Sequence, residues 1–383
     1  MSRPDFVTSP TRARLTGAAV AFVLVLLAAL ASASGVGAQS RDFDDVRVFA
    51  DVPDNPGLPE GIAVDRRHER VYVGTNPGGN NPGAQSGQRS DLLAYSLDGE
   101  LKRTYDIRGQ DLASMALPAY GLQALAVDRG GDVFALDKAP ARILRIDPKT
   151  GRQTTYATFE DVPPCSTVEN GQCSETAEDL RAFPNYLTFA PDGTLYVTDF
   201  QQALIWRVKP GGGKARVAFT DPRLDGGMGP NGIQMQRLGN RIVFAQSMNP
   251  PGTGTPGAGR LYRLNVARDG GLSKLRSFYE SAPGEGIDGI AIGRSGNVYF
   301  NLFTTNQTVV VDRDGEEIDR VPENPAANAA LERPFDAPAS SGFLGRRLLT
   351  TNQSVVLRNP ASFAVLDIAT GERGLPLFRP RMR

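Results

Sequence analysis

Two carboxylates and two carboxamides stand at the same place in four copies of a short repeated motif, and all four offer hard oxygen donors. They are Glu60, Asn185, Asn231 and Asp288, each followed by a short, mostly apolar run. Carboxylate and amide oxygens suit Ca²⁺ best, and they serve Mg²⁺ or Mn²⁺ less well. If the fold brings the four together, the sequence predicts a divalent cation site. Ca²⁺ is the expected ion, with Mg²⁺, Mn²⁺ and Zn²⁺ as alternatives.

We call this motif position the slot, and two further residues align with it. Gln123 opens a fifth copy and Asp336 a sixth, degenerate one. We expect both on the substrate side of the site, Gln123 as a donor that faces the substrate and Asp336 as a structural acid or as an acid behind the ligands. Asp and Asn before a strand often bond neighbouring backbone amides instead. Four polar residues at equivalent places favour a shared site over that local explanation.

The slots must be positioned by a repeated unit of short strands. Each slot is followed by a strand, a turn and a second strand, and successive slots lie 46 to 63 residues apart. Such units cannot bury their own faces and stack on their neighbours, and this spacing is typical of propeller blades. We predict an all-β, six-bladed β-propeller formed by residues 39–383 as a single domain. Its slots would meet at one end of a central channel.

Closure of the ring requires one more strand in the sixth blade. Residues 46–51 at the start of the chain and residues 375–378 near its end both read as strands. Pairing of the N- and C-terminal strands in one blade would remove the free edges that an open sheet leaves. We therefore predict closure by the N-terminal strand, with residues 375–378 as the alternative.

Composition excludes several functional classes. The formal net charge is +0, so the chain offers no basic field for nucleic acid. His68 is the single histidine, which rules out a Ser-His-Asp triad and a multi-histidine zinc site. We expect a small-molecule substrate or ligand as partner, and the sequence leaves the oligomeric state open.

The first 38 residues have the pattern of a secretory signal. A basic stretch precedes an apolar run over residues 15–30, and small residues at Val36 to Ala38 offer a cleavage site. The alternative is a retained membrane anchor. Cleavage predicts a secreted, periplasmic or cell-envelope protein without a stable membrane span.

The two cysteines, Cys165 and Cys173, lie in one polar loop. In an exported protein they most simply form a local disulfide. A redox or metal-binding pair is the alternative, and supporting ligands are missing nearby.

The slot motifs resemble those of the senescence marker protein/gluconolactonase superfamily, six-bladed propellers related to paraoxonases and more distantly to strictosidine synthases. The resemblance rests on Pro59-Glu60-Gly61, Pro184-Asn185, Pro230-Asn231-Gly232 and Ile287-Asp288-Gly289. It implies that Glu60, Asn185, Asn231 and Asp288 hold a divalent cation at the top of the channel. It also implies that Asp288 is the general base of lactone hydrolysis.

Two hypotheses follow from these observations. The first is a secreted, metal-dependent hydrolase of a lactone or related ester, in which the cation polarises the carbonyl and Asp288 accepts a proton. The second is a non-catalytic propeller that binds a small ligand and keeps the cation for structure. Residues 336–342 resemble the yellow/royal-jelly propellers, where catalysis is often absent. The histidine pair of paraoxonases cannot exist here, because His68 is in the wrong turn.

Overall fold

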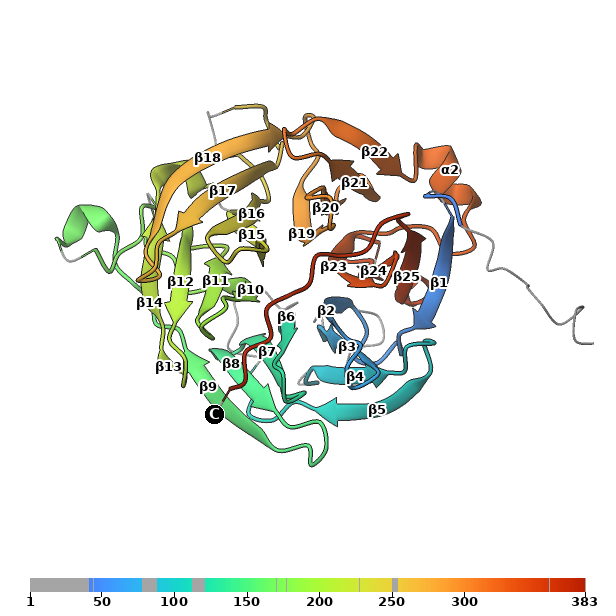
Figure 1. The fold of residues 1–383 in the computed structure, drawn as a ribbon, viewed down its shortest axis with the longest axis horizontal. Helices are drawn as coiled ribbons and strands as arrows, with labels where there is room; N and C mark the ends of the chain where they lie inside the picture. The colour runs from blue at the N-terminus through green and yellow to red at the C-terminus, as the bar shows by residue number, and fades with distance from the viewer. Residues whose placement is uncertain are drawn as a thin grey trace, which may run out of the picture. The chain divides into compact units, whose positions relative to one another are not determined.

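Six sheets, each with four main strands in antiparallel pairing, surround a common axis in the computed structural model (Figure 1). The structure describes residues 41–43, 45–77, 88–111, 121–169, 171–176, 178–226, 228–249, 254–357 and 359–382, and the sheets belong to the unit Asp42–Arg383. The predicted six-bladed β-propeller is confirmed. The predicted signal, residues 1–38, lies outside the described residues.

In blades 1 to 5 the four main strands run in chain order from an innermost strand at the channel to an outermost strand at the rim. Blade 1 contains β2 (Pro59–Asp65), β3 (Arg70–Thr75), β4 (Asp91–Tyr95) and β5 (Leu101–Asp106). Blade 2 contains β6 (Leu122–Val127), β7 (Val133–Lys138), β8 (Ala141–Ile146) and β9 (Gln153–Thr158), extended by β13 (Gly213–Lys214). Blade 3 contains β10 (Pro184–Phe189), β11 (Leu195–Asp199), β12 (Leu204–Val208) and β14 (Arg216–Thr220).

Blades 4 and 5 follow the same plan. Blade 4 contains β15 (Pro230–Met235), β16 (Arg241–Gln246), β17 (Arg260–Val266) and β18 (Leu272–Glu280). Blade 5 contains β19 (Ile287–Ile292), β20 (Val298–Leu302), β21 (Gln307–Val311) and β22 (Glu317–Val321). Short helices lie in the connections: α2 (Pro325–Ala330), and the 3₁₀ helices η2 (Cys165–Thr167), η3 (Pro222–Leu224) and η4 (Pro360–Ser362).

Blade 6 joins the two ends of the domain. It contains β23 (Pro338–Leu344), β24 (Arg347–Asn352) and β25 (Ala364–Ala369), and its outermost strand is β1 (Val46–Asp51). Val46 lies opposite Ile368 in an antiparallel pair, so the predicted closure by the N-terminal strand is confirmed. The competing residues 375–378 instead cross the channel on the face nearest the viewer in Figure 1. There the amide of Leu375 donates to the carbonyl of Ile292 at 2.8 Å.

The hydrophobic core lies between neighbouring blades. One cluster combines Val64 of β2 with Leu349 of β24, and another combines Tyr72 of β3 with Leu125 of β6. All seven residues of β2 are buried, including the polar ones. Because both faces of an inner strand are covered by the adjacent blades, its polar residues are buried with it. The closed ring is therefore what buries the slots.

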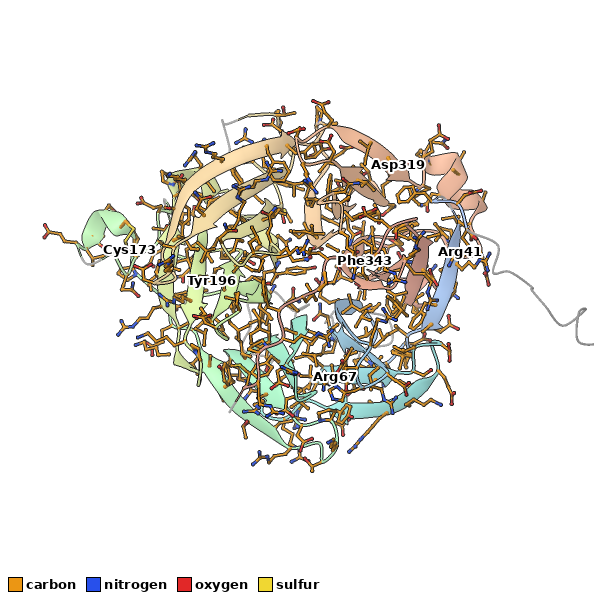
Figure 2. The ribbon with its side chains drawn as sticks, in the orientation of Figure 1. Arg41, Arg67, Cys173, Tyr196, Asp319 and Phe343 are labelled. Atoms are coloured by element: carbon orange, nitrogen blue, oxygen red, sulfur yellow. A yellow bond between two sulfur atoms is a disulfide. The ribbon has the colours of Figure 1, made fainter. Side chains whose placement is uncertain are left out.

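The loop that holds the two cysteines lies at the rim. Cys165 and Cys173 form a disulfide, as predicted, and Figure 2 shows Cys173 at the outer edge of the ring, away from the channel. In the described ranges, no helix has the length and apolar character needed to cross a bilayer.

Candidate functional site

The same backbone irregularity occurs at the start of every innermost strand. In each blade the pairing between the first two strands shifts between the first and fourth residues of the inner strand, as between Pro59 and Ile62 or between Pro184 and Leu187. The corresponding shift is found in the other four blades. A bulge leaves its residues unpaired and can re-aim a side chain. The slot residue, second in each strand, is thus set apart from the sheet ladder.

The strand registers place five of the six predicted slot residues and correct the sixth. Glu60, Gln123, Asn185, Asn231 and Asp288 each follow the first residue of an inner strand. In blade 6 that position is Ala339, since Pro338 pairs with Asn352 as the first residue of β23. The alignment of Asp336 with the slot was therefore wrong by three residues.

Asp336 is held within its own blade. Its carboxylate accepts a hydrogen bond from the hydroxyl of Ser354, and its carbonyl accepts from the Ser354 amide at 2.7 Å. The Asp336 amide donates to Oδ1 of Asn352 at 2.7 Å. These contacts fix the loop before β23 and give Asp336 a structural position. Gln123 remains in its slot, where its side-chain amide donates to Oδ1 of Asn76 at 3.3 Å.

Glycines after three of the slots allow neighbouring inner strands to approach at the channel. A Cβ on Gly61 would lie 2.3 Å from the carbonyl oxygen of Gln123, and one on Gly232 would lie 2.7 Å from that of Asp288. A Cβ on Gly289 would lie 2.6 Å from the carbonyl oxygen of Ala339. In each case the obstacle is the slot backbone of the next blade. These glycines therefore set how closely adjacent slots can stand.

We expect Gly289→Ala to destabilise the protein by about 1–3 kcal/mol, because the added methyl group has no space and must displace the next blade. The same methyl group would lie 2.7 Å from the hydroxyl of Tyr186. Gly342→Ala is the matched control, since there the nearest atom is a side-chain methyl of Val64 at 3.3 Å. Urea unfolding of both variants measures the difference, and equal midpoints would contradict the packing argument.

Polar residues on second strands hold the slot carbonyls of the next blade. Oγ1 of Thr351 donates to the carbonyl of Glu60 at 2.7 Å, and Oγ1 of Thr198 donates to that of Asn231 at 2.7 Å. Asn301 donates through Nδ2 to the carbonyl of Ala339 at 2.5 Å. Buried carbonyls need such partners once they leave a ladder. Each of these slot carbonyls is thus held by a side chain of the preceding blade.

A lysine that the sequence did not single out lies among the slot side chains. Nζ of Lys138, the last residue of β7, donates to Oδ1 of Asn185 at 2.6 Å. Nδ2 of Asn185 then donates to Oδ1 of Asn231 at 2.6 Å. Nδ2 of Asn231 in turn donates to Oγ of Ser247 at 2.7 Å. One directional chain of hydrogen bonds runs from the lysine through both carboxamides.

Aromatic rings and carboxyl groups surround the Lys138 ammonium. Nζ lies 3.8 Å from the ring centroid of Phe183 and 5.9 Å from that of Phe200. Burial lowers the pKa of Lys138 to about 7, while the negative charges of Glu60, Asp288 and Asp199 oppose that shift. A cation over an aromatic face and near carboxylates is held electrostatically.

The two slot carboxyls differ in exposure and partners. Asp288 is partly exposed, whereas Glu60 is buried at 3% exposure. Burial raises the pKa of Asp288 to about 6, against hydrogen bonds from Tyr186 and Asn231 and the charge of Lys138. Burial followed by the charge of Asp288 raises the pKa of Glu60 well above its usual range. Of the two slot acids, Asp288 is therefore the less buried residue and the one whose pKa stays near neutral pH.

Each carboxyl also has a fixed neutral partner. The hydroxyl of Tyr186 lies 3.2 Å from Oδ1 of Asp288 and 2.6 Å from Oγ of Ser340. The side-chain amide of Gln353 donates to Glu60. These contacts restrict the orientation of both acids.

Lys138 belongs to a second ring of residues. In every blade, the first residue of the inner strand pairs with a residue at or near the end of the second strand. The residues that directly follow these partners form the second ring: Asn76, Lys138, Phe200, Ser247, Phe303 and Gln353. Four of its members contact slot side chains, and Lys138 alone among the six is charged. β7 ends Leu136-Asp137-Lys138, so the lysine follows another charged residue and has no local pattern that marks it as part of a site.

The predicted divalent ion does not fit this donor set while Lys138 is charged. The oxygens have suitable chemistry for Ca²⁺. However, Oδ1 of Asn185 already accepts from the ammonium, and Oδ1 of Asn231 accepts from Asn185. A divalent cation there would also face a positive charge in a poorly solvated space.

A cavity of about 670 Å³ is lined by residues of all six inner strands, Tyr186 and Ser340 among them. It is lined by the inner strands and by the C-terminal segment that crosses the channel in Figure 1. Glu60, Asn185, Asn231, Asp288 and Lys138 do not line it. Tyr186 therefore reaches both this cavity and the slot cluster, since its hydroxyl contacts Oδ1 of Asp288 at 3.2 Å.

Comparison with known proteins gives one family and many similar folds. Residues 124–332 match the model of the SMP-30/Gluconolactonase/LRE-like region. No curated protein sequence matches the chain.

Solved structures share the fold at low identity. Regucalcin from Agrobacterium tumefaciens, a calcium-binding protein, has a TM-score of 0.57 over 88% of this chain and 99% of that one, with 18% identity. A gluconolactonase from Xanthomonas campestris has a TM-score of 0.54 over 90% and 94%, with 17% identity. Virginiamycin B lyase from Staphylococcus aureus has a TM-score of 0.52 over 85% and 99%, with 16% identity.

Proposed function

Because the chain belongs to the SMP-30/gluconolactonase/LRE-like family, we propose that it hydrolyses a lactone or a related ester at the slot cluster. The observation that carries this proposal is the arrangement around Asp288. Asp288 is a residue of intermediate exposure whose carboxyl has a pKa raised by burial to about 6, and it lies within the field of the buried Lys138 ammonium. An acid of that pKa can accept a proton near neutral pH, as a general base must.

The reaction requires few groups. A water molecule attacks the ester carbonyl carbon while Asp288 takes its proton, and the carbonyl oxygen becomes negative. Fixed donors or positive charges that face this oxygen stabilise the transition state. Lys138 is the positive charge that the described site residues provide. Collapse of the intermediate breaks the bond to the leaving oxygen, which recovers the proton from Asp288.

The hydrogen bonds of Tyr186 support this assignment, because they hold Asp288 in a fixed orientation. Tyr186 binds its Oδ1 at 3.2 Å and is itself held by Ser340. A positioned acid loses less entropy when it meets its substrate and the attacking water.

The predicted export belongs to the same proposal, whereas the predicted metal dependence does not. The disulfide between Cys165 and Cys173 favours an oxidising compartment outside the cytoplasm. The regucalcin likeness and the oxygen-rich slots favour a divalent ion, whereas the ammonium of Lys138 opposes one. We propose the exported hydrolase without deriving any step from a metal.

We expect a bell-shaped dependence of kcat on pH. Asp288 must be ionised, so the rate should rise as pH passes about 6, the value to which burial raises its pKa. Lys138 must keep its proton, so the rate should fall as pH passes about 7, the value to which burial lowers its pKa. The apparent pKa values of the two sides of this profile belong to the coupled cluster of ionisable groups rather than to single residues. Initial rates between pH 4 and 10 measure the profile, and a rate that still rises at pH 9 would contradict it.

The function is tested with a panel of lactones of graded ring size and a set of phenyl esters. Purified protein comprising residues 39–383 is incubated with each, and acid release is followed by pH-stat titration. Turnover of at least one lactone above the uncatalysed rate supports the proposal. Tight binding of a lactone without turnover would favour the ligand-binding propeller instead.

A further inference from the structure

We infer that Lys138 is the resident cation of this site, and that its ammonium takes the place of a divalent metal ion. The inference concerns what neutralises the slot acids and holds the carboxamides. It goes beyond the proposed hydrolysis, because it would hold equally for a protein that only binds its ligand.

The first support is the charge balance of the cluster. Glu60 and Asp288 place two acidic side chains in the slots, and the Lys138 ammonium enters the same cluster through its hydrogen bond to Oδ1 of Asn185 at 2.6 Å. Buried carboxylates require a positive partner or a proton. Lys138 supplies a positive partner from inside the chain.

The second support is the geometry of the two carboxamides. A metal in the slots would be bound by the carbonyl oxygens of Asn185 and Asn231 together. Instead, the Asn185 oxygen accepts from Nζ of Lys138 at 2.6 Å, and its amide nitrogen turns to the oxygen of Asn231 at 2.6 Å. The lysine thus sets the direction of the whole chain, which ends on Ser247 at 2.7 Å.

The third support is the way in which the lysine is built into the fold. Lys138 is the last residue of β7, and only 6% of it is exposed. The Phe183 ring lies over its ammonium at 3.8 Å. An aromatic face favours an organic cation and leaves no room on that side for the water ligands that Ca²⁺ usually keeps.

The other members of the second ring show what this position holds elsewhere. Blade 4 has Ser247 there, a small neutral donor and acceptor, and blade 6 has Gln353. Lys138→Ser therefore introduces at blade 2 the side chain that blade 4 already carries. It removes the charge and opens space beside Glu60, Asn185 and Asp288.

The experiment measures Ca²⁺ in the absence of any substrate. Wild-type protein and the Lys138→Ser, Lys138→Ala and Lys138→Arg variants are dialysed against chelator, then titrated with CaCl₂ in a calorimeter. Metal content is determined after gel filtration in buffer containing Ca²⁺. Lys209→Met, a change on an exposed turn, is the control for loss of a lysine. Circular dichroism confirms that each variant is folded.

We expect wild type, Lys138→Arg and Lys209→Met to bind no stoichiometric Ca²⁺. Lys138→Ser or Lys138→Ala should each bind one ion, with a dissociation constant at or below about 10⁻⁴ M. A folded but merely structural lysine would not produce this gain. The inference is overturned if wild type binds one tightly held divalent ion, or if the folded serine and alanine variants bind none. Either result leaves the lactone assay unaffected, so the two proposals fail separately.

Discussion

Asp288→Asn is expected to lower lactone turnover by about 10² to 10⁴-fold, the usual effect of removing a general base. That factor corresponds to about 3–5 kcal/mol of transition-state stabilisation. Asparagine keeps an oxygen that can accept from Tyr186, which now binds Asp288 at 3.2 Å. The variant should therefore fold and bind its ligand while losing the proton acceptor.

The comparison requires kcat and KM for wild type, Asp288→Asn and Asp179→Asn. Asp179 is an exposed acid on the segment that leads to Asn185, so its replacement controls for loss of one negative charge. The effect should appear in kcat, since KM would change if Asp288 only bound substrate. An Asp288→Asn variant with wild-type kcat would remove this residue from the mechanism.

Trp206→Ala should destabilise the protein by about 3–5 kcal/mol, because it deletes a large buried side chain and leaves a cavity. Trp206 is 1% exposed and packs against Phe159 at 5.8 Å between ring centroids. Its Nε1 also donates to Oδ2 of Asp199 at 2.9 Å, the oxygen that accepts from the Phe183 amide at 2.9 Å. Loss of Trp206 should thus loosen the residue whose ring covers Lys138.

Trp206→Phe separates the two contributions. It keeps most of the packing and loses only the hydrogen bond, which is worth about 1.5–3 kcal/mol when the acceptor is charged. Urea unfolding should rank wild type first, the phenylalanine variant second and the alanine variant last. An alanine variant as stable as wild type would contradict the placement of Trp206 in the core.

Repetition is why the architecture could be predicted from sequence. Each polar slot begins a short, mostly apolar run, so alignment of Glu60, Asn185, Asn231 and Asp288 located four inner strands. The closing strand followed from the need to pair the edges of the sixth blade. The sixth slot failed for a physical reason: Ala339 carries no polar atom, and Asp336 offered a false match three residues away.

The role of Lys138 could not be predicted from sequence, because it depends on a contact between two blades. The lysine leaves β7 in blade 2 but reaches the slot of blade 3, and the ring above it, Phe183, precedes β10. Contacts of this kind between blades leave no fixed spacing along the chain. The same holds for Tyr186 and Ser340, which bind one another from blades 3 and 6.

The central claim is that a lysine-centred cluster hydrolyses lactones without a bound metal ion. The direct measurement is kcat/KM for the best lactone of the panel, before and after exhaustive dialysis against chelator, with metal content determined on the same samples. We predict that kcat/KM stays within about twofold while Ca, Mg, Mn and Zn remain far below one ion per chain. Loss of turnover on dialysis, with recovery on addition of Ca²⁺, would contradict the account.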